Sequence, residues 1–128
     1  MKKTDQFEVS FFEQLVQRRP NYVEALSALA EVYTACSLYE KGLEIDQRLA
    51  VLCPEDSLVF YNLACSYALL SRHDLALKAL EQALGLGYTD WKYMRHDPDF
   101  KTLSHDPRFK ALLAAMQEKK AQSKRRKK

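Results

Sequence analysis

The strongest constraint on the fold is a repeat with a period of 34 positions, which extends from Pro20 to Asp90. Shifting the sequence by 34 positions places residues of similar size and character on one another. The aligned pairs are Pro20 with Pro54, Leu26 with Phe60, Leu29 with Leu63, Ala30 with Ala64, Tyr33 with Tyr67, Gly42 with Ala76, Leu43 with Leu77, Ala50 with Leu84 and Leu52 with Leu86. A period of this length indicates one supersecondary unit that is copied and stacked.

The first repeat, residues 20–56, carries its apolar residues at the spacing of a helix face, one every three or four positions. This spacing predicts a helix over about residues 22–36 and a second over about residues 38–52. Ser37 marks the turn between the two helices. The two helices are therefore expected to lie antiparallel, as one pair.

The second repeat, residues 57–90, follows the same plan. Asp74 is the predicted N-cap of its second helix, because aspartate accepts hydrogen bonds from free backbone N–H groups. Gly87 is the predicted end of that helix, since glycine is common just after helix ends. The repeat register ends here, because Tyr88 stands where a third proline would be expected.

Two residues of the first repeat have special positions. Gly42 is expected where the two helices cross, since small side chains let helix axes approach closely. Asp46 departs from the pattern, because Phe12 and Leu80, its neighbours by the same shift, are apolar. Looser local packing is therefore predicted around Asp46.

Segments with helical patterns flank the repeats. Residues 7–19 align with the second helix of a repeat whose first helix is missing, and their apolar residues are Phe7, Phe11, Phe12, Leu15 and Val16. Residues 91–118 contain the sequence Asp-Pro-x-Phe twice, nine positions apart, at Asp97 and at Asp106. Each aspartate is a predicted N-cap, and each proline suits the first helical position.

The repeat resembles the tetratricopeptide repeat (TPR), a helix–turn–helix unit that stacks into a solenoid. Residues 91–118 resemble the capping segment that closes many bacterial TPR proteins. The resemblance implies an all-α, short TPR solenoid over residues 1–118. Antiparallel helix pairs would form two repeats between an N-terminal half-repeat and a C-terminal helical cap. It also implies protein binding on the concave side, which the first helices of the repeats line.

The groove candidates are residues of these helices that the apolar stripe does not use. On the two first helices they are Glu24, Ser27, Ala28, Glu31, Leu58, Tyr61, Asn62 and Cys65, and from the cap they are Lys92, Arg95 and His96. This set predicts a groove with acid at one end and base at the other. TPR domains that hold free C-termini use a clamp of Lys, Asn and Arg, of which Asn62 and Lys92 are present. Ser27 and Glu31 replace the first two clamp residues, so we expect no preference for a free carboxylate.

The charge is unevenly distributed along the chain. Residues 1–118 hold 13 Lys and Arg against 17 Asp and Glu, whereas residues 119–128 hold 7 Lys and Arg and no acid. This last segment lacks an apolar face and is predicted to be a disordered basic tail. Its cations could contact nucleic acid or an anionic surface weakly through phosphates. They are Lys119, Lys120, Lys124, Arg125, Arg126, Lys127 and Lys128.

Motifs for catalysis or cofactor binding are missing from the sequence. It contains no phosphate-binding glycine loop, GxSxG, HExxH or CxxC pattern, so we expect no enzyme activity, no cofactor and no metal. No apolar run reaches the 18 or so residues of a membrane span. Three cysteines and an N-terminus without a secretory pattern favour the cytoplasm.

These observations predict a protein–protein interaction module or adaptor that binds a peptide or a helical segment in its groove. One alternative is a secretion-type chaperone for an unfolded substrate. Another is a nucleic-acid- or ribosome-associated accessory protein that acts through the tail. Self-association is a further alternative, because solenoids usually need about three repeats to be stable.

Overall fold

The structure is a computed structural model that describes residues 2–126, and this part of the chain contains helices and no strand. None of its helices combines the length and the apolar character that a membrane span needs. The elements are α1 (Lys3–Arg18), α2 (Val23–Ala35), α3 (Tyr39–Leu52), α4 (Ser57–Leu69), α5 (His73–Gly85), α6 (Trp91–His96), the 3-10 helix η1 (Pro98–Leu103) and α7 (Pro107–Arg126).

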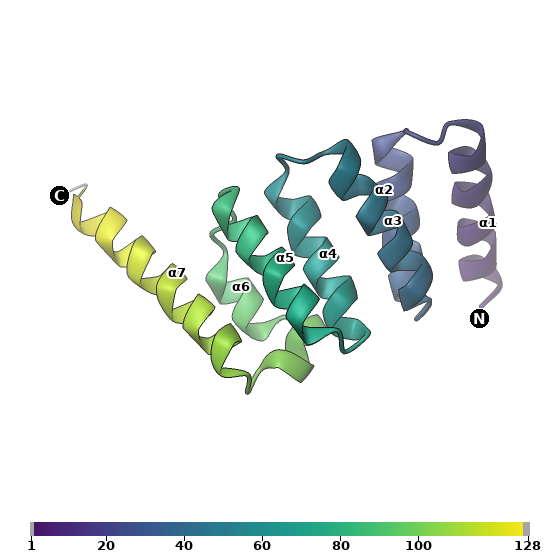
Figure 1. Cartoon of the computed structure of the whole chain (residues 1–128). Helices are drawn as coiled ribbons and strands as arrows, with labels where there is room; N and C mark the ends of the chain where they lie inside the picture. Colours follow the sequence, from purple (N-terminus) through teal and green to yellow (C-terminus); the bar gives the residue numbers. More distant parts are fainter. Residues whose placement is uncertain (1, 127–128) are drawn as a thin grey trace.

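The first five helices form a row in which each packs against the next in sequence, from α1 to α5. Figure 1 shows α1 at one end of the row and α7 at the other. Helix α4 begins and ends one sequence period after α2, and α5 begins one sequence period after α3. The period therefore corresponds to one pair of helices, and the predicted all-α class is confirmed.

The turns inside the two pairs have the same backbone conformation. Ser37 and Ser71 both have positive φ, 61° and 58°, and the next residue donates its N–H to the carbonyl five positions earlier. Gly87, with φ of 108°, ends α5 in the same way, as predicted. Asp74 is not the N-cap of α5, because the helix already begins at His73 and Asp74 lies in its first turn.

The close approach of α2 and α3 explains Gly42. A Cβ atom there would lie 3.2 Å from Thr34 Oγ1 and 3.8 Å from the carbonyl oxygen of Ala30. Both residues belong to α2, so the predicted helix crossing is confirmed. The loose packing predicted around Asp46 is wrong, because this side chain is only 4% exposed and accepts a hydrogen bond from Ser66 of α4.

The apolar side chains divide into two buried clusters. The N-terminal cluster is built from α1, α2, α3 and the start of α4. The C-terminal cluster extends from α3 through α4 and α5 to Met94, Phe100, Leu103, Phe109 and Met116. The segment after the repeats is therefore part of a core, and it covers the last helix pair.

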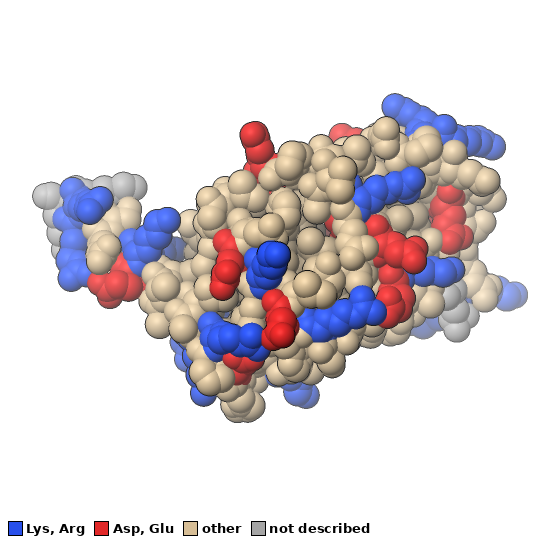
Figure 2. All heavy atoms as spheres, in the orientation of Figure 1, with Lys and Arg blue, Asp and Glu red and all other residues tan. Residues whose placement is uncertain are grey.

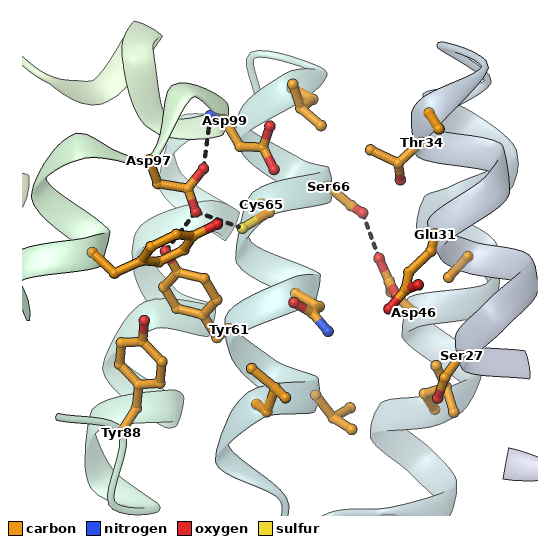
Figure 3. Close-up of a pocket in the computed structure, with 18 of the residues that line it drawn as sticks. Ser27, Glu31, Thr34, Asp46, Tyr61, Cys65, Ser66, Tyr88, Asp97 and Asp99 are labelled. Atoms are coloured by element: carbon orange, nitrogen blue, oxygen red, sulfur yellow. Dashed lines mark hydrogen bonds between the residues drawn. The ribbon is translucent and has the colours of Figure 1, made fainter. Parts of the chain in front are cut away.

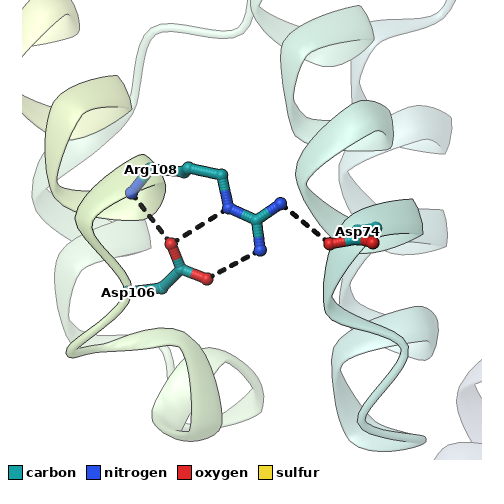
Figure 4. Close-up of polar contacts among 3 residues, drawn as sticks. All are labelled: Asp74, Asp106 and Arg108. Atoms are coloured by element: carbon teal, nitrogen blue, oxygen red, sulfur yellow. Dashed lines mark hydrogen bonds and ion pairs between the residues drawn. The ribbon is translucent and has the colours of Figure 1, made fainter.

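Both Asp-Pro sequences begin helices, as predicted. Asp97 accepts from the N–H of Asp99 at 3.0 Å, and Asp106 accepts from the N–H of Arg108 at 2.8 Å. The Arg108 guanidinium also pairs with Asp106 at 2.9 Å and with Asp74 of α5 at 2.8 Å (Figure 4). These exposed ion pairs orient the start of α7 and contribute little to stability.

The two ends of the chain differ from expectation. In α1, Phe7 and Phe11 point to solvent, and Val9, Phe12, Leu15 and Val16 form the packed face. Helix α7 continues to Arg126, so residues 119–126, which we predicted to be disordered, are helical. The predicted tail residues Lys127 and Lys128 lie outside the described residues.

Candidate functional site

A groove of about 750 Å³ crosses the middle of the row. Helix α4 supplies most of its floor, and Asp46 and Leu49 of α3 complete it. Residues of α2 form one wall, and the segment from Tyr88 to Asp99 forms the other. Figure 3 shows Ser27, Glu31 and Thr34 on the α2 side, facing Tyr61 and Cys65 of α4 and Asp97 and Asp99 beyond them.

Most of the predicted groove residues on the first helices of the two pairs line it, namely Ser27, Glu31, Leu58, Tyr61, Asn62 and Cys65. Glu24 and Ala28 of α2, and His96 of α6, do not. Lys92 and Arg95 do not line it, although both are exposed. Lys92 Nζ lies instead 5.8 Å from the ring centre of Trp91. Helix α6 has only six residues, and its groove-facing side chain is Tyr93.

The charge of the groove differs from the predicted gradient. Its described lining includes no Lys, Arg or His, and its charged members are Glu31, Asp46, Asp90, Asp97 and Asp99. Glu31 and Asp90 are exposed on opposite walls, and Asp99, on the same wall as Asp90, is half-buried. Acidic side chains therefore lie on both walls, because the wall that was expected to be basic supplies aspartates.

Apolar side chains are exposed in the same groove. Leu58, at the start of α4, is 56% exposed, and Tyr93 of α6 is 57% exposed. The rings of Tyr61 and Tyr88 stack at a centroid distance of 4.3 Å, and Tyr93 lies 6.3 Å from Tyr61. A ligand in the groove would thus meet both an aliphatic side chain and aromatic rings.

A hydrogen-bonded cluster of Tyr61, Cys65 and Asp97 joins α4 to the wall. Tyr61 Oη donates to Asp97 Oδ2 at 2.6 Å, and Cys65 Sγ donates to the same oxygen at 3.8 Å. Burial raises the pKa of Tyr61, and the bond to Asp97 raises it further. Burial also raises the pKa of the Cys65 thiol, with a smaller contribution from the charges of Asp97 and Asp99.

The same cluster resembles a metal-ligand set in its composition. One ligand atom each of Cys65, Asp97 and Asp99 lies within 4.8 Å of the others. A cysteine binds a metal as the thiolate, and burial, which raises the pKa of Cys65, disfavours that form. Asp97 already accepts from Tyr61 and from the N–H of Asp99. The arrangement is a hydrogen-bonded network centred on the Asp97 carboxylate, with the Asp99 carboxylate beside it.

Asp46 and Ser66 form the second buried polar pair of the groove. Ser66 Oγ donates to Asp46 Oδ2 across the contact between α3 and α4. Burial raises the pKa of Asp46 to about 6, although the Ser66 bond lowers it in part. The charged form is therefore disfavoured in the folded protein relative to the unfolded chain.

This pair gives a pH-dependent prediction. The pKa of Asp46 is about 6 in the folded protein and 3.8 as the ordinary value, so the folded state binds more protons between pH 3.8 and pH 6. The contribution of Asp46 to stability therefore falls as the pH rises from 3.8 to 6. The difference of about two pKa units corresponds to about 3 kcal/mol. We expect Asp46→Asn to be more stable than the native protein by about 1–3 kcal/mol near pH 7.5, and this advantage to shrink to about 1 kcal/mol or less near pH 4.5.

Urea unfolding at both pH values measures this difference. Glu44→Gln, on an exposed position of the same helix, is the control for loss of one negative charge. An Asp46→Asn advantage that is the same at both pH values, or that Glu44→Gln shares, would contradict the burial explanation.

Asp90, Tyr93, Asp97 and Asp99 are among the groove residues that were not predicted as such from the sequence. Asp97 was predicted only as a helix cap, a role that it has, while its other oxygen faces the groove cluster. The signal that could have found them is the density of acids from 90 to 99, three aspartates beside a histidine and a tyrosine. Such composition does not by itself show which side chains of the segment face the groove.

Part of the chain is similar to a known protein. No protein-family model matches the chain. Over 90 residues the chain is 37% identical to a chloroplastic protein of Arabidopsis thaliana, a match that covers 68% of this chain. The matched region is 25% of that protein, so the chain spans about a quarter of its length. What that larger protein does as a whole therefore cannot be assigned to this chain.

Proposed function

We propose that the chain is a protein-interaction module that binds a peptide or helical segment of a partner protein in the groove. The observation that carries the proposal is the concave surface of about 750 Å³ that exposes Leu58 and Tyr93. Large apolar side chains that stay exposed in a depression lose water-accessible area when a ligand covers them, which favours binding. Buried hydrogen bonds fix Tyr61, Cys65 and Asp97, so this part of the groove needs little ordering on binding.

We propose further that the fold is a short TPR solenoid of two repeats, with α1 as a half-repeat and α6, η1 and α7 as the cap. Three observations support this assignment. The helix pairs recur at the period of the sequence, the turns at Ser37 and Ser71 share one conformation, and Gly42 permits a close helix crossing. In such a solenoid the groove lies on the side lined by the first helix of each pair, α2 and α4.

The lining also argues against a nucleic-acid ligand, a free C-terminal carboxylate and catalysis. Nucleic acid or a free C-terminal carboxylate would bring negative charge to Glu31, Asp90 and Asp99, which repel it. Catalysis by Cys65 would need its thiolate, and burial, which raises the pKa of that thiol, disfavours the thiolate. We therefore propose binding without chemistry and without a cofactor.

Peptide display on the full-length chain tests this function. A library of random peptides of about 12 residues is selected against the native protein, and the selected peptides are measured against Leu58→Glu. We expect at least about tenfold weaker binding to the variant, because it replaces an exposed apolar contact with a charge. Val51→Glu, which changes an exposed apolar residue outside the groove, should leave the affinity unchanged.

Circular dichroism of both variants verifies that the helices are retained. The proposal fails if no peptide is selected, or if the selected peptides bind Leu58→Glu as tightly as the native protein. It also fails if Val51→Glu weakens binding as much as Leu58→Glu does, because the groove would then contribute no more to peptide binding than the rest of the surface.

A further inference from the structure

The end of α7 is a helical segment with no packing on the rest of the chain. All residues from Gln117 to Arg126 are exposed, and the contacts of α7 with α5 and α6 come from its earlier turns, through Phe109, Leu112, Leu113 and Met116. Figure 1 shows α7 leaning away from the row of helices, so that its last turns project beyond α6. Ten residues of helix extend about 15 Å. A helix that is polar on every side gains nothing from packing and is marginal alone.

This projecting segment is strongly basic. The described cations after Glu118 are Lys119, Lys120, Lys124, Arg125 and Arg126. Figure 2 shows Lys and Arg side chains gathered around this end of the molecule. Arg125 pairs with Glu118 of the same helix at 3.2 Å, an exposed contact that offsets one charge of the five. We call residues 119–126 the basic end.

The groove has the complementary properties. Its acidic residues are distributed along both walls and the floor, and no cation among its described lining neutralises them. Tyr93 and Tyr88 add aromatic faces beside Asp90, and such faces attract guanidinium and ammonium groups. Carboxylates beside tyrosine rings suit the fork of an arginine and the ammonium of a lysine.

The basic end cannot enter the groove of its own chain while α7 stays intact. The helix leaves the core beside α5 and α6 and continues outward, whereas the groove lies between α2 and the segment from Tyr88 to Asp99. Reaching it would require α7 to break and turn back across α6. A second copy has no such obstacle, because its basic end projects freely.

We propose that the groove of one copy binds the basic end of a second copy. This inference rests on the proposed function, since it uses the same groove, and it names an occupant that the chain itself supplies. Docking of this kind would keep the groove covered until a partner with a tighter-binding segment displaces the basic end. Because the groove and the basic end are different surfaces, the contact either closes reciprocally into a dimer or propagates as a chain.

A charge-exchange experiment on the full-length protein tests the proposal. The groove variant is Glu31→Lys/Asn62→Lys, at two exposed positions of α2 and α4, and the end variant is Lys124→Glu/Arg125→Glu/Arg126→Glu. Sedimentation velocity of the native protein in about 50 mM salt should show concentration-dependent association, weakened at least about tenfold near 1 M salt, where the screening length is short. Each variant alone should associate at least about tenfold more weakly.

Mixing the two variants gives the decisive result. The groove variant retains a native basic end, and the end variant retains a native acidic groove, so the mixture should form a complex in which the two variants are present in equal amounts. The matched control is Glu81→Lys/Gln82→Lys on α5, which changes the charge by the same amount at exposed positions outside the groove and should associate as the native protein does.

Three results would overturn the proposal. One is a native protein that remains monomeric at low salt up to about 1 mM. Another is association that persists in both variants, because the contact would then lie elsewhere. Loss of association in the α5 control would count against the proposal in the same way. The third is RNA binding in place of self-association. In that case the native protein does not self-associate, its basic end binds single-stranded RNA with strong salt dependence, and the groove variant binds the RNA equally well. In each case the peptide-display result still decides the proposed function separately.

Discussion

Truncating Phe100 to alanine is expected to lower the free energy of unfolding by about 4 kcal/mol, within the range of about 3–5 kcal/mol for removing a buried phenylalanine. Phe100 is 2% exposed and contacts two aromatic rings. Its centroid lies 5.5 Å from that of Tyr61 on α4 and 5.6 Å from that of Phe109 on α7. One side chain therefore joins the helix pairs to the closing segment, and its loss leaves a cavity at the junction.

Urea unfolding followed by circular dichroism measures the effect. Phe7→Ala is the matched control, because Phe7 is 70% exposed on α1 and its truncation should change stability by less than about 0.5 kcal/mol. Equal destabilisation by the two variants would mean that η1 does not pack on α4 in solution.

Replacing Asp97 with alanine is expected to cost about 3 kcal/mol, the sum of a lost cap and a lost hydrogen-bond acceptor. Loss of the cap on η1 accounts for about 1 kcal/mol of this. The Tyr61 hydroxyl, which is buried and donates to Asp97, would lose its partner, and an unsatisfied buried donor costs about 1–3 kcal/mol. Asp97→Asn, which keeps an acceptor oxygen near both donors, should cost about 1 kcal/mol.

A double-mutant cycle with Tyr61→Phe separates the two contributions. We expect Tyr61→Phe to have almost no further cost in the Asp97→Ala background, so that the coupling free energy is about 1–2 kcal/mol. Additive effects would show that the tyrosine–aspartate bond contributes nothing to stability and that only the cap matters.

The helices of the repeats were predictable because each of their positions answers to one requirement, either burial on the apolar face or exposure to solvent. A second helix expected over about residues 38–52 is observed as Tyr39–Leu52, and the apolar stripe of α2 is buried as its spacing predicts. Gly42 and Gly87 were predictable for the same reason, since glycine is used where a close approach or a positive φ requires it.

The groove was predicted only on its repeat side, for a physical reason. Periodicity assigns faces to helices of three or more turns, but six residues of α6 make fewer than two turns, so spacing could not orient Tyr93 relative to Lys92. Asp97 was ambiguous because an aspartate has two oxygens, and its capping role uses one of them. Asp46 misled because an isolated acid among apolar neighbours suggests exposure, whereas Ser66, 20 positions away, satisfies it.

The division of the core into two clusters has a consequence for how the molecule opens. The boundary between the clusters runs through α3 and α4, beneath the groove, with the Asp46–Ser66 pair at the seam. Stacked repeats unfold as coupled neighbouring units, so the two halves can exchange their amide hydrogens at different rates. A ligand that touches both α2 and Tyr93 would span this seam, and its binding energy would couple the two halves into a single cooperative unit.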